Sequence, residues 1–124
     1  MTADSRPRPD DGTNVLAQML GVLLAPAITL AGQQLAYQYV PHDCRTRSSL
    51  LGHFIHGSTL LMCLAGAFIA WSEWQRHGGG WPDEDVGGAA GRSRFLGAVG
   101  VLISLLFALV AAAQWMPTFF LSPC

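Results

Sequence analysis

The sequence contains no lysine and few charged residues of any kind. Charged residues make up 12% of its 124 residues, and all seven cationic side chains are arginines. With eight acidic residues the net charge is −1, so the chain offers no basic surface for nucleic acid. Hydrophobic residues make up 51%, and the mean hydropathy is +0.34. This balance is typical of an integral membrane protein rather than of a soluble domain.

Three long segments contain no charged residue at all. They cover residues 14–39, 49–71 and 95–116. A bilayer core about 30 Å thick needs about 20 apolar residues of helix, and because lipid cannot hydrogen-bond the backbone, such segments must be helical. The sequence therefore predicts an all-α membrane protein with three transmembrane helices in one domain, residues 14–124. Ala25-Pro26-Ala27 matches a signal-peptide cleavage pattern, but the apolar run continues beyond it, so we expect an uncleaved span.

The arginines indicate how the helices are oriented. Five of them flank the start of the first span and the connection between the second and third: Arg6, Arg8, Arg76, Arg92 and Arg94. The other two, Arg45 and Arg47, lie in the first connection. Because arginine-rich connections stay in the cytoplasm, we predict a cytoplasmic N-terminus, an outside C-terminus and, in a bacterium, a multi-pass protein of the inner membrane. Residues 1–13 and 72–94, rich in Asp, Pro and Gly, are predicted to form a disordered cytoplasmic tail and a flexible cytoplasmic loop.

Each predicted span has a helix face made of small residues. In the first span they recur every four positions: Ala17, Gly21, Ala25 and Thr29. The second span has Thr59, Cys63, Gly66, Ala67 and Ala70, with His56 on the same face, and the third has Gly97, Gly100, Ser104, Ala108 and Ala112. Small side chains let helix backbones approach closely, which is how helices associate in lipid. We therefore predict a compact bundle whose first helix is kinked at Pro26.

Polar side chains gather near the predicted outer ends of the spans. At a rise of 1.5 Å per residue they lie within about 10 Å of those ends. They are Gln33, Gln34, Tyr37, Gln38, His53, His56 and Gln114. Polar groups at this depth need partners, and three interpretations are open. The side chains hydrogen-bond across the helices; or His53 and His56, three residues apart, bind haem or copper; or the layer contacts a larger membrane complex or a quinone-like lipid.

The three cysteines fall in two environments. Cys63 lies in the middle of the second span, where a small buried side chain is expected. Cys44 and Cys124 each follow a span on the predicted outer side, and an oxidising compartment favours a disulfide bond there. We predict that bond. The alternative is a copper or haem site with these candidate ligands: His42, Cys44, His53, His56 and Cys124.

Two segments carry a resemblance to a known family. One runs from Ala25-Pro26-Ala27 through Gln33-Gln34-Leu35-Ala36-Tyr37 to Val40-Pro41-His42-Asp43-Cys44. The other runs from Arg94-Phe95-Leu96 through Ala113-Gln114-Trp115-Met116-Pro117-Thr118-Phe119-Phe120 to Pro123-Cys124. In these segments the chain resembles small three-span inner-membrane proteins of proteobacteria whose genes accompany those of haem-copper cytochrome c oxidases. His42-Asp43 stand where that family has bulkier aromatic residues, so the resemblance assigns no ligand role to His42.

The resemblance implies an association with aerobic respiration. The function it leads us to expect is that of a non-catalytic accessory subunit or assembly factor of a respiratory haem-copper oxidase. Such a protein would have cytochrome c oxidase subunits and the lipid bilayer as partners and no cofactor of its own. The alternative function is the handling of copper or haem on the outer side. The sequence has no phosphate-binding glycine loop and no serine-nucleophile motif, and we expect no enzymatic activity.

Overall fold

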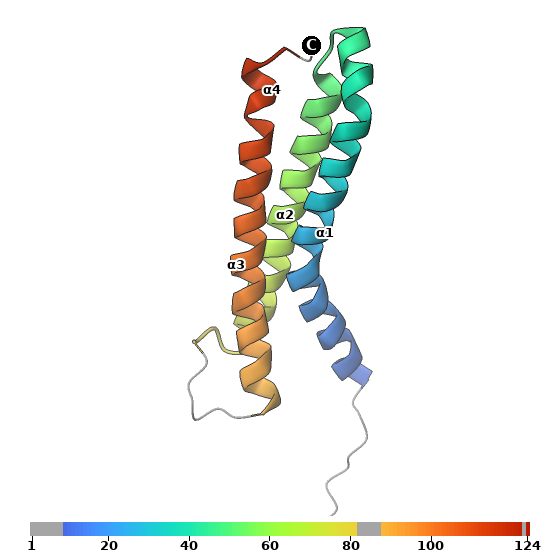
Figure 1. Ribbon diagram of the computed structural model, residues 1–124. Coiled ribbons are helices and arrows are strands. Elements are labelled where there is room, and N and C mark those ends of the chain that lie inside the picture. The colour runs from blue at the N-terminus through green and yellow to red at the C-terminus, as the bar shows by residue number, and fades with distance from the viewer. Residues whose placement is uncertain (1–8, 82–87, 123) are drawn as a thin grey trace, which may run out of the picture.

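The computed structural model describes residues 9–81, 88–122 and 124, and within them it is built of helices (Figure 1). Three long helices, α1 (Pro9–Thr46), α2 (Leu50–Arg76) and α3 (Ala89–Trp115), lie side by side. The short α4 (Pro117–Phe120) continues the direction of α3. Each long helix contains a segment long and apolar enough to cross a membrane. The predicted all-α architecture with three candidate transmembrane helices is therefore confirmed.

The first helix is longer than the predicted span at both ends. It begins at Pro9, so the second part of the predicted tail, residues 9–13, is helical rather than disordered; residues 1–8 lie outside the described part of the chain. It also continues past Pro41, which cannot donate to the carbonyl of Tyr37 but does not end the helix. An uncharged window marks the part of a helix that lies in hydrocarbon, whereas helical hydrogen bonding can extend into the polar layer on either side.

The predicted loop 72–94 is likewise shorter in the structure. Helix α2 continues to its end at Arg76, and α3 begins at Ala89. Residues 82–87 of the loop lie outside the described part of the chain. Near the end of α2, the guanidinium of Arg94 donates to the carbonyl of His77, and the indole of Trp74 donates to the carbonyl of Gly80 at 3.3 Å. The first bond joins α3 to the end of α2, and the second holds the start of the loop against α2.

The interior of the bundle is made of small residues and its surface of large ones. Cys63 and Ser104 are the largest side chains that are completely buried. The large apolar side chains point outward; those more than half exposed include Leu16, Leu23, Leu30, Leu61, Phe68, Leu102 and Leu109. This distribution is the reverse of a soluble protein's. It fits helices that pack through small residues while their large apolar side chains face lipid tails.

The three long helices meet at Gly21, Ala70 and Gly100. A Cβ atom added to Gly100 would lie 3.0 Å from the Cβ of Ala70 and 3.1 Å from the carbonyl oxygen of Gly21. A Cβ added to Gly21 would lie 3.2 Å from the Cβ of Ala70. One residue on each helix thus meets the other two, and a side chain at position 21 or 100 would require a neighbouring helix to shift. The predicted small-residue faces account for this contact.

Polar groups near Pro26 hydrogen-bond between the helices. The buried hydroxyl of Ser104 on α3 donates to the carbonyl of Gly21 at 3.2 Å. On the other side of Pro26, the hydroxyl of Thr29 donates to the carbonyl of Ala25 at 2.8 Å and lies 3.4 Å from the sulfur of Cys63. Neighbouring hydroxyl groups commonly support the backbone around a proline in a transmembrane helix. Cys63 is buried, as predicted, and its sulfur contributes to this group.

Candidate functional site

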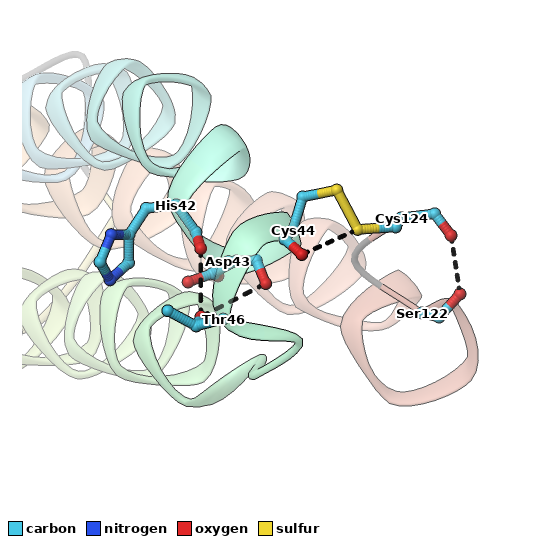
Figure 2. The surroundings of a disulfide bond; sticks show 6 residues. All are labelled: His42, Asp43, Cys44, Thr46, Ser122 and Cys124. Carbon is cyan, nitrogen blue, oxygen red and sulfur yellow. Dashed lines mark hydrogen bonds between the residues drawn. A yellow bond between two sulfur atoms is a disulfide. The ribbon is translucent and has the colours of Figure 1, made fainter.

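The end of the bundle that carries the C-terminus is closed by a disulfide bond between Cys44 and Cys124 (Figure 2). Their Cα atoms are 5.1 Å apart although the residues are separated by 80 positions in sequence. Cys44 lies in the final turns of α1, and Cys124 lies beyond α4. The disulfide therefore ties the C-terminal segment to the end of α1. We call this end of the bundle, which comprises the end of α1, the start of α2 and α4, the disulfide end.

A tight turn between α1 and α2 fixes the backbone next to Cys44. Arg47 adopts a left-handed conformation, with φ of 52°, and the N–H of Ser48 donates to the carbonyl of Asp43 at 3.3 Å. This is the pattern of a Schellman motif, with arginine where glycine is usual. The hydroxyl of Thr46 donates to the carbonyl of His42 at 3.1 Å (Figure 2). The turn brings the carboxylate of Asp43 to the first turn of α2, where a Cβ on Gly52 would lie 3.4 Å from it.

His53 is held by aromatic residues of α3 and α4. The indole N–H of Trp115 donates to Nδ1 of His53 at 2.9 Å, and the hydroxyl of Thr118 lies 3.4 Å from the same nitrogen. The ring of Phe119 packs on the imidazole, with centroids 4.7 Å apart. Because Nδ1 accepts from Trp115, the proton of the neutral imidazole is on Nε2. His53 therefore joins α2 to the end of α3.

His56 faces a different environment, between α1 and α3. It lines two adjoining cavities at the disulfide end, which share the lining residues Ala36, Val40, His56 and Pro117. The first, about 180 Å³, extends toward the α1–α2 turn and is also lined by Asp43, Ser49, Gly52, Thr118, Leu121 and Ser122. We call it the turn cavity. The second, about 290 Å³, lies between α1 and α3 and is also lined by Gln33, Tyr37 and Gln114. We call it the side cavity.

The structure divides the predicted polar layer into three groups. Gln33, Tyr37, His56 and Gln114 meet around the side cavity. His53 lies apart from them, against Trp115 and Phe119. Gln34 and Gln38 are exposed on the outer surface of α1. The residues around the side cavity come from all three long helices, whereas His53, Gln34 and Gln38 do not line that cavity.

The five candidate metal ligands are not gathered at one place. Cys44 and Cys124 are bonded to each other, and Figure 2 shows the imidazole of His42 pointing away from their sulfur atoms. His53 and His56 face different neighbours. Within residues 9–81, 88–122 and 124, no group of three or more His, Cys, Asp or Glu side chains is placed to hold a metal ion.

Sequence reasoning missed the partners of His53 and the position of Asp43. The sequence-based prediction assigns no contact to Trp115. Its spacing from Thr118 and Phe119, three and four residues, places all three on one helix face. That spacing is the signal that could have identified them as a group. Asp43 gave no such signal, because its position over α2 depends on the turn at Arg47.

Comparison with known proteins gives no relative for this arrangement: no family model, no curated protein and no solved structure matches the chain. The class that the structure supports is an all-helical protein with three helices able to cross a membrane.

Replacing Trp115 with phenylalanine is expected to lower the free energy of unfolding by about 1 kcal/mol, because a partly buried hydrogen bond to Nδ1 of His53 is lost while the aromatic ring is kept. The matched control is Trp71→Phe, since Trp71 is 47% exposed and packs edge-on against Trp74. Unfolding in mixed micelles with increasing dodecyl sulfate, followed by circular dichroism, measures both variants. Equal effects of the two substitutions would contradict the assigned role of the Trp115 N–H.

Proposed function

We propose that the chain is a multi-pass protein of the bacterial inner membrane, with its disulfide end outside, and that it serves as a non-catalytic accessory subunit or assembly factor of a respiratory haem-copper oxidase. Outside is the oxidising side, where a disulfide bond persists. The distribution of arginines supports the same orientation, because Arg76, Arg92 and Arg94 lie at the opposite end of the bundle and two more arginines precede α1 in the sequence.

The observation that carries this proposal is the polar surface of α1 near the disulfide end. Gln34 and Gln38 are exposed there, one helical turn apart, and Tyr37 between them is 69% exposed. Lipid tails offer amide groups no hydrogen bonds, so two such groups on the outer surface of a transmembrane helix are costly unless another protein covers them. The surface therefore suits a partner within the membrane.

The resemblance supplies the identity of that partner. The two segments that resemble the oxidase-associated proteins end in Cys44 and Cys124, and they contribute most of the disulfide end. The first of these segments contains both exposed glutamines, Gln34 and Gln38. The resemblance includes residues 25–44 of α1 and residues 94–124, which cover most of α3 and all of α4, and a docking surface shared at the disulfide end would produce it.

The proposal predicts that oxidase subunits co-purify with the chain from native membranes in mild detergent. The double variant Gln34→Leu/Gln38→Leu is expected to reduce their recovery at least about fivefold, since each lost hydrogen bond to a partner contributes about 0.5–1.5 kcal/mol. Gln75→Leu is the matched control, because Gln75 is also an exposed helical glutamine but lies at the end of α2 that is far from the disulfide end. Recovery is measured by quantitative mass spectrometry of the co-purified subunits.

Two outcomes would contradict this proposal. If no oxidase subunit co-purifies with the wild-type protein, the protein has no such partner. Stoichiometric copper or haem in the purified protein, lost on replacing His53 and His56 with alanine, would instead support the copper or haem handling alternative.

A further inference from the structure

The two cavities at the disulfide end adjoin each other around His56, and all three long helices contribute to their walls. We propose that together they form a binding site for the ring of an isoprenoid quinone. Such a ring is flat, uncharged and mostly apolar, and its two carbonyl oxygens accept hydrogen bonds. This inference goes beyond the proposed role in an oxidase complex and rests on the isolated chain.

The side cavity offers hydrogen-bond donors that have no partner among the residues that the structure describes. Gln33 and Gln114 carry amide N–H groups, and His56 carries an imidazole N–H. Within the described residues, the hydrogen bonds of this region are made by His53, Trp115 and Thr118, and none involves the side chains of these three. The rest of the lining is apolar apart from the phenol of Tyr37. An apolar pocket with a few convergent donors is the usual form of a small-molecule site.

The charges around the cavities exclude other ligand classes. No arginine lines either cavity, and the one formal charge is the carboxylate of Asp43 in the turn cavity. A phospholipid headgroup would place its phosphate beside this carboxylate without a cation to pair with it. Among His, Cys, Asp and Glu side chains, a metal ion would find only Asp43 and His56 in the described lining. A neutral acceptor-bearing ring meets neither difficulty.

The size and opening of the side cavity agree with a ring whose tail stays outside. Its volume of about 290 Å³ is near the lower end of the range of about 300–1,000 Å³ for ligand sites, which is room for a ring but not for an isoprenoid chain. Tyr37 lines this cavity and is 69% exposed, so the cavity opens on the surface of α1. Through this opening the tail would reach the surrounding lipid.

The test uses the full-length protein in nanodiscs of zwitterionic phospholipid, with decylubiquinone as the probe and empty nanodiscs as the reference for partitioning into lipid. We expect saturable retention of one quinone per protein above that reference. Gln33→Leu is expected to weaken binding by about twofold to tenfold through loss of one hydrogen bond. Gln34→Leu removes the neighbouring amide, which lines neither cavity, and is expected to leave the dissociation constant unchanged.

A second variant tests whether the quinone binds inside the cavities. Ala36 lines both cavities, and Ala36→Phe is expected to abolish saturable retention by filling them. Mass spectrometry shows whether the Ala36→Phe variant still forms the Cys44–Cys124 bond, and therefore whether the disulfide end still assembles. If it does not, the comparison of Gln33→Leu with Gln34→Leu decides the matter.

Three results would overturn the proposal: retention no greater than in empty nanodiscs, equal dissociation constants for the Gln33→Leu and Gln34→Leu variants, or displacement of the quinone by an equal amount of phosphatidylglycerol. The last would assign the cavities to a lipid headgroup. Because the measurement uses the isolated protein, it is independent of whether oxidase subunits co-purify.

Discussion

Leucine in place of Gly100 is expected to lower the free energy of unfolding by about 3 kcal/mol, near the upper end of the usual range for overpacked interiors. Its first side-chain carbon alone would meet the Cβ of Ala70 at 3.0 Å and the carbonyl oxygen of Gly21 at 3.1 Å. Both of these atoms belong to, or are fixed to, the backbones of α1 and α2. Neither can turn aside as a long side chain could, so the helices must separate.

Separation at this point affects more than one contact. The hydroxyl of Ser104, one turn further along α3, reaches the carbonyl of the same Gly21 at 3.2 Å. If α3 moves outward, this buried hydrogen bond is lost as well, and a buried hydroxyl without a partner costs about 1–3 kcal/mol. The two effects act in the same direction, and they are coupled because they share Gly21.

Unfolding by dodecyl sulfate in mixed micelles measures the effect, and Ala113→Leu is the matched control. Ala113 lies on the exposed side of α3, so the added carbon atoms face detergent and the change in free energy is expected to stay within about 0.5 kcal/mol. A loss of stability as large for Ala113→Leu as for Gly100→Leu would show that the close approach of the three helices is not what the glycine preserves.

The packing faces could be predicted from the sequence because small residues at helical spacing have one physical use in lipid. Gly21, Ala25 and Thr29 are all buried, as are Cys63 and Ala70. The prediction fails at Ala112, which is exposed while Ala111 is completely buried. A row of residues four apart drifts by about 40° per step around a helix with 3.6 residues per turn. Starting from Gly100, residue 112 has therefore left the packed face.

The sequence predicts which polar side chains lie at the same depth in the bundle, but not which of them contact each other. Depth along a helix follows from residue number, so the sequence brings His53, His56 and Gln114 to one level. Which side chain each meets depends on the rotation of the helices about their axes and on the turn at Arg47. Two histidines three residues apart point about 60° away from each other, and here that difference places His53 against Trp115 and His56 in the cavities.

Breaking the bond between Cys44 and Cys124 is expected to have the largest effect on stability of any change at the disulfide end. A cross-link spanning 80 residues restricts the unfolded chain by about 4 kcal/mol in the chain-entropy model. This value is an upper bound here, because helices that stay inserted in a micelle or bilayer are already restricted. Cys44→Ser, Cys124→Ser and the double variant should lose the same amount, because each breaks the same bond. Reductant should bring wild-type protein to that level and leave the variants unchanged.

The bond also reports the orientation of the chain, because its two sulfur atoms lie at one end of the bundle (Figure 2). In intact cells, a membrane-impermeant maleimide is expected to label Cys44 and Cys124 only after treatment with a membrane-impermeant reductant. Cys63 is buried between the helices and should stay unlabelled, which makes it an internal control. Labelling without reductant would contradict the disulfide bond, and labelling only after the cells are opened would place this end in the cytoplasm. In a cytoplasmic setting the bond would be held reduced, and the two cysteines would then be thiols able to bind a soft metal ion.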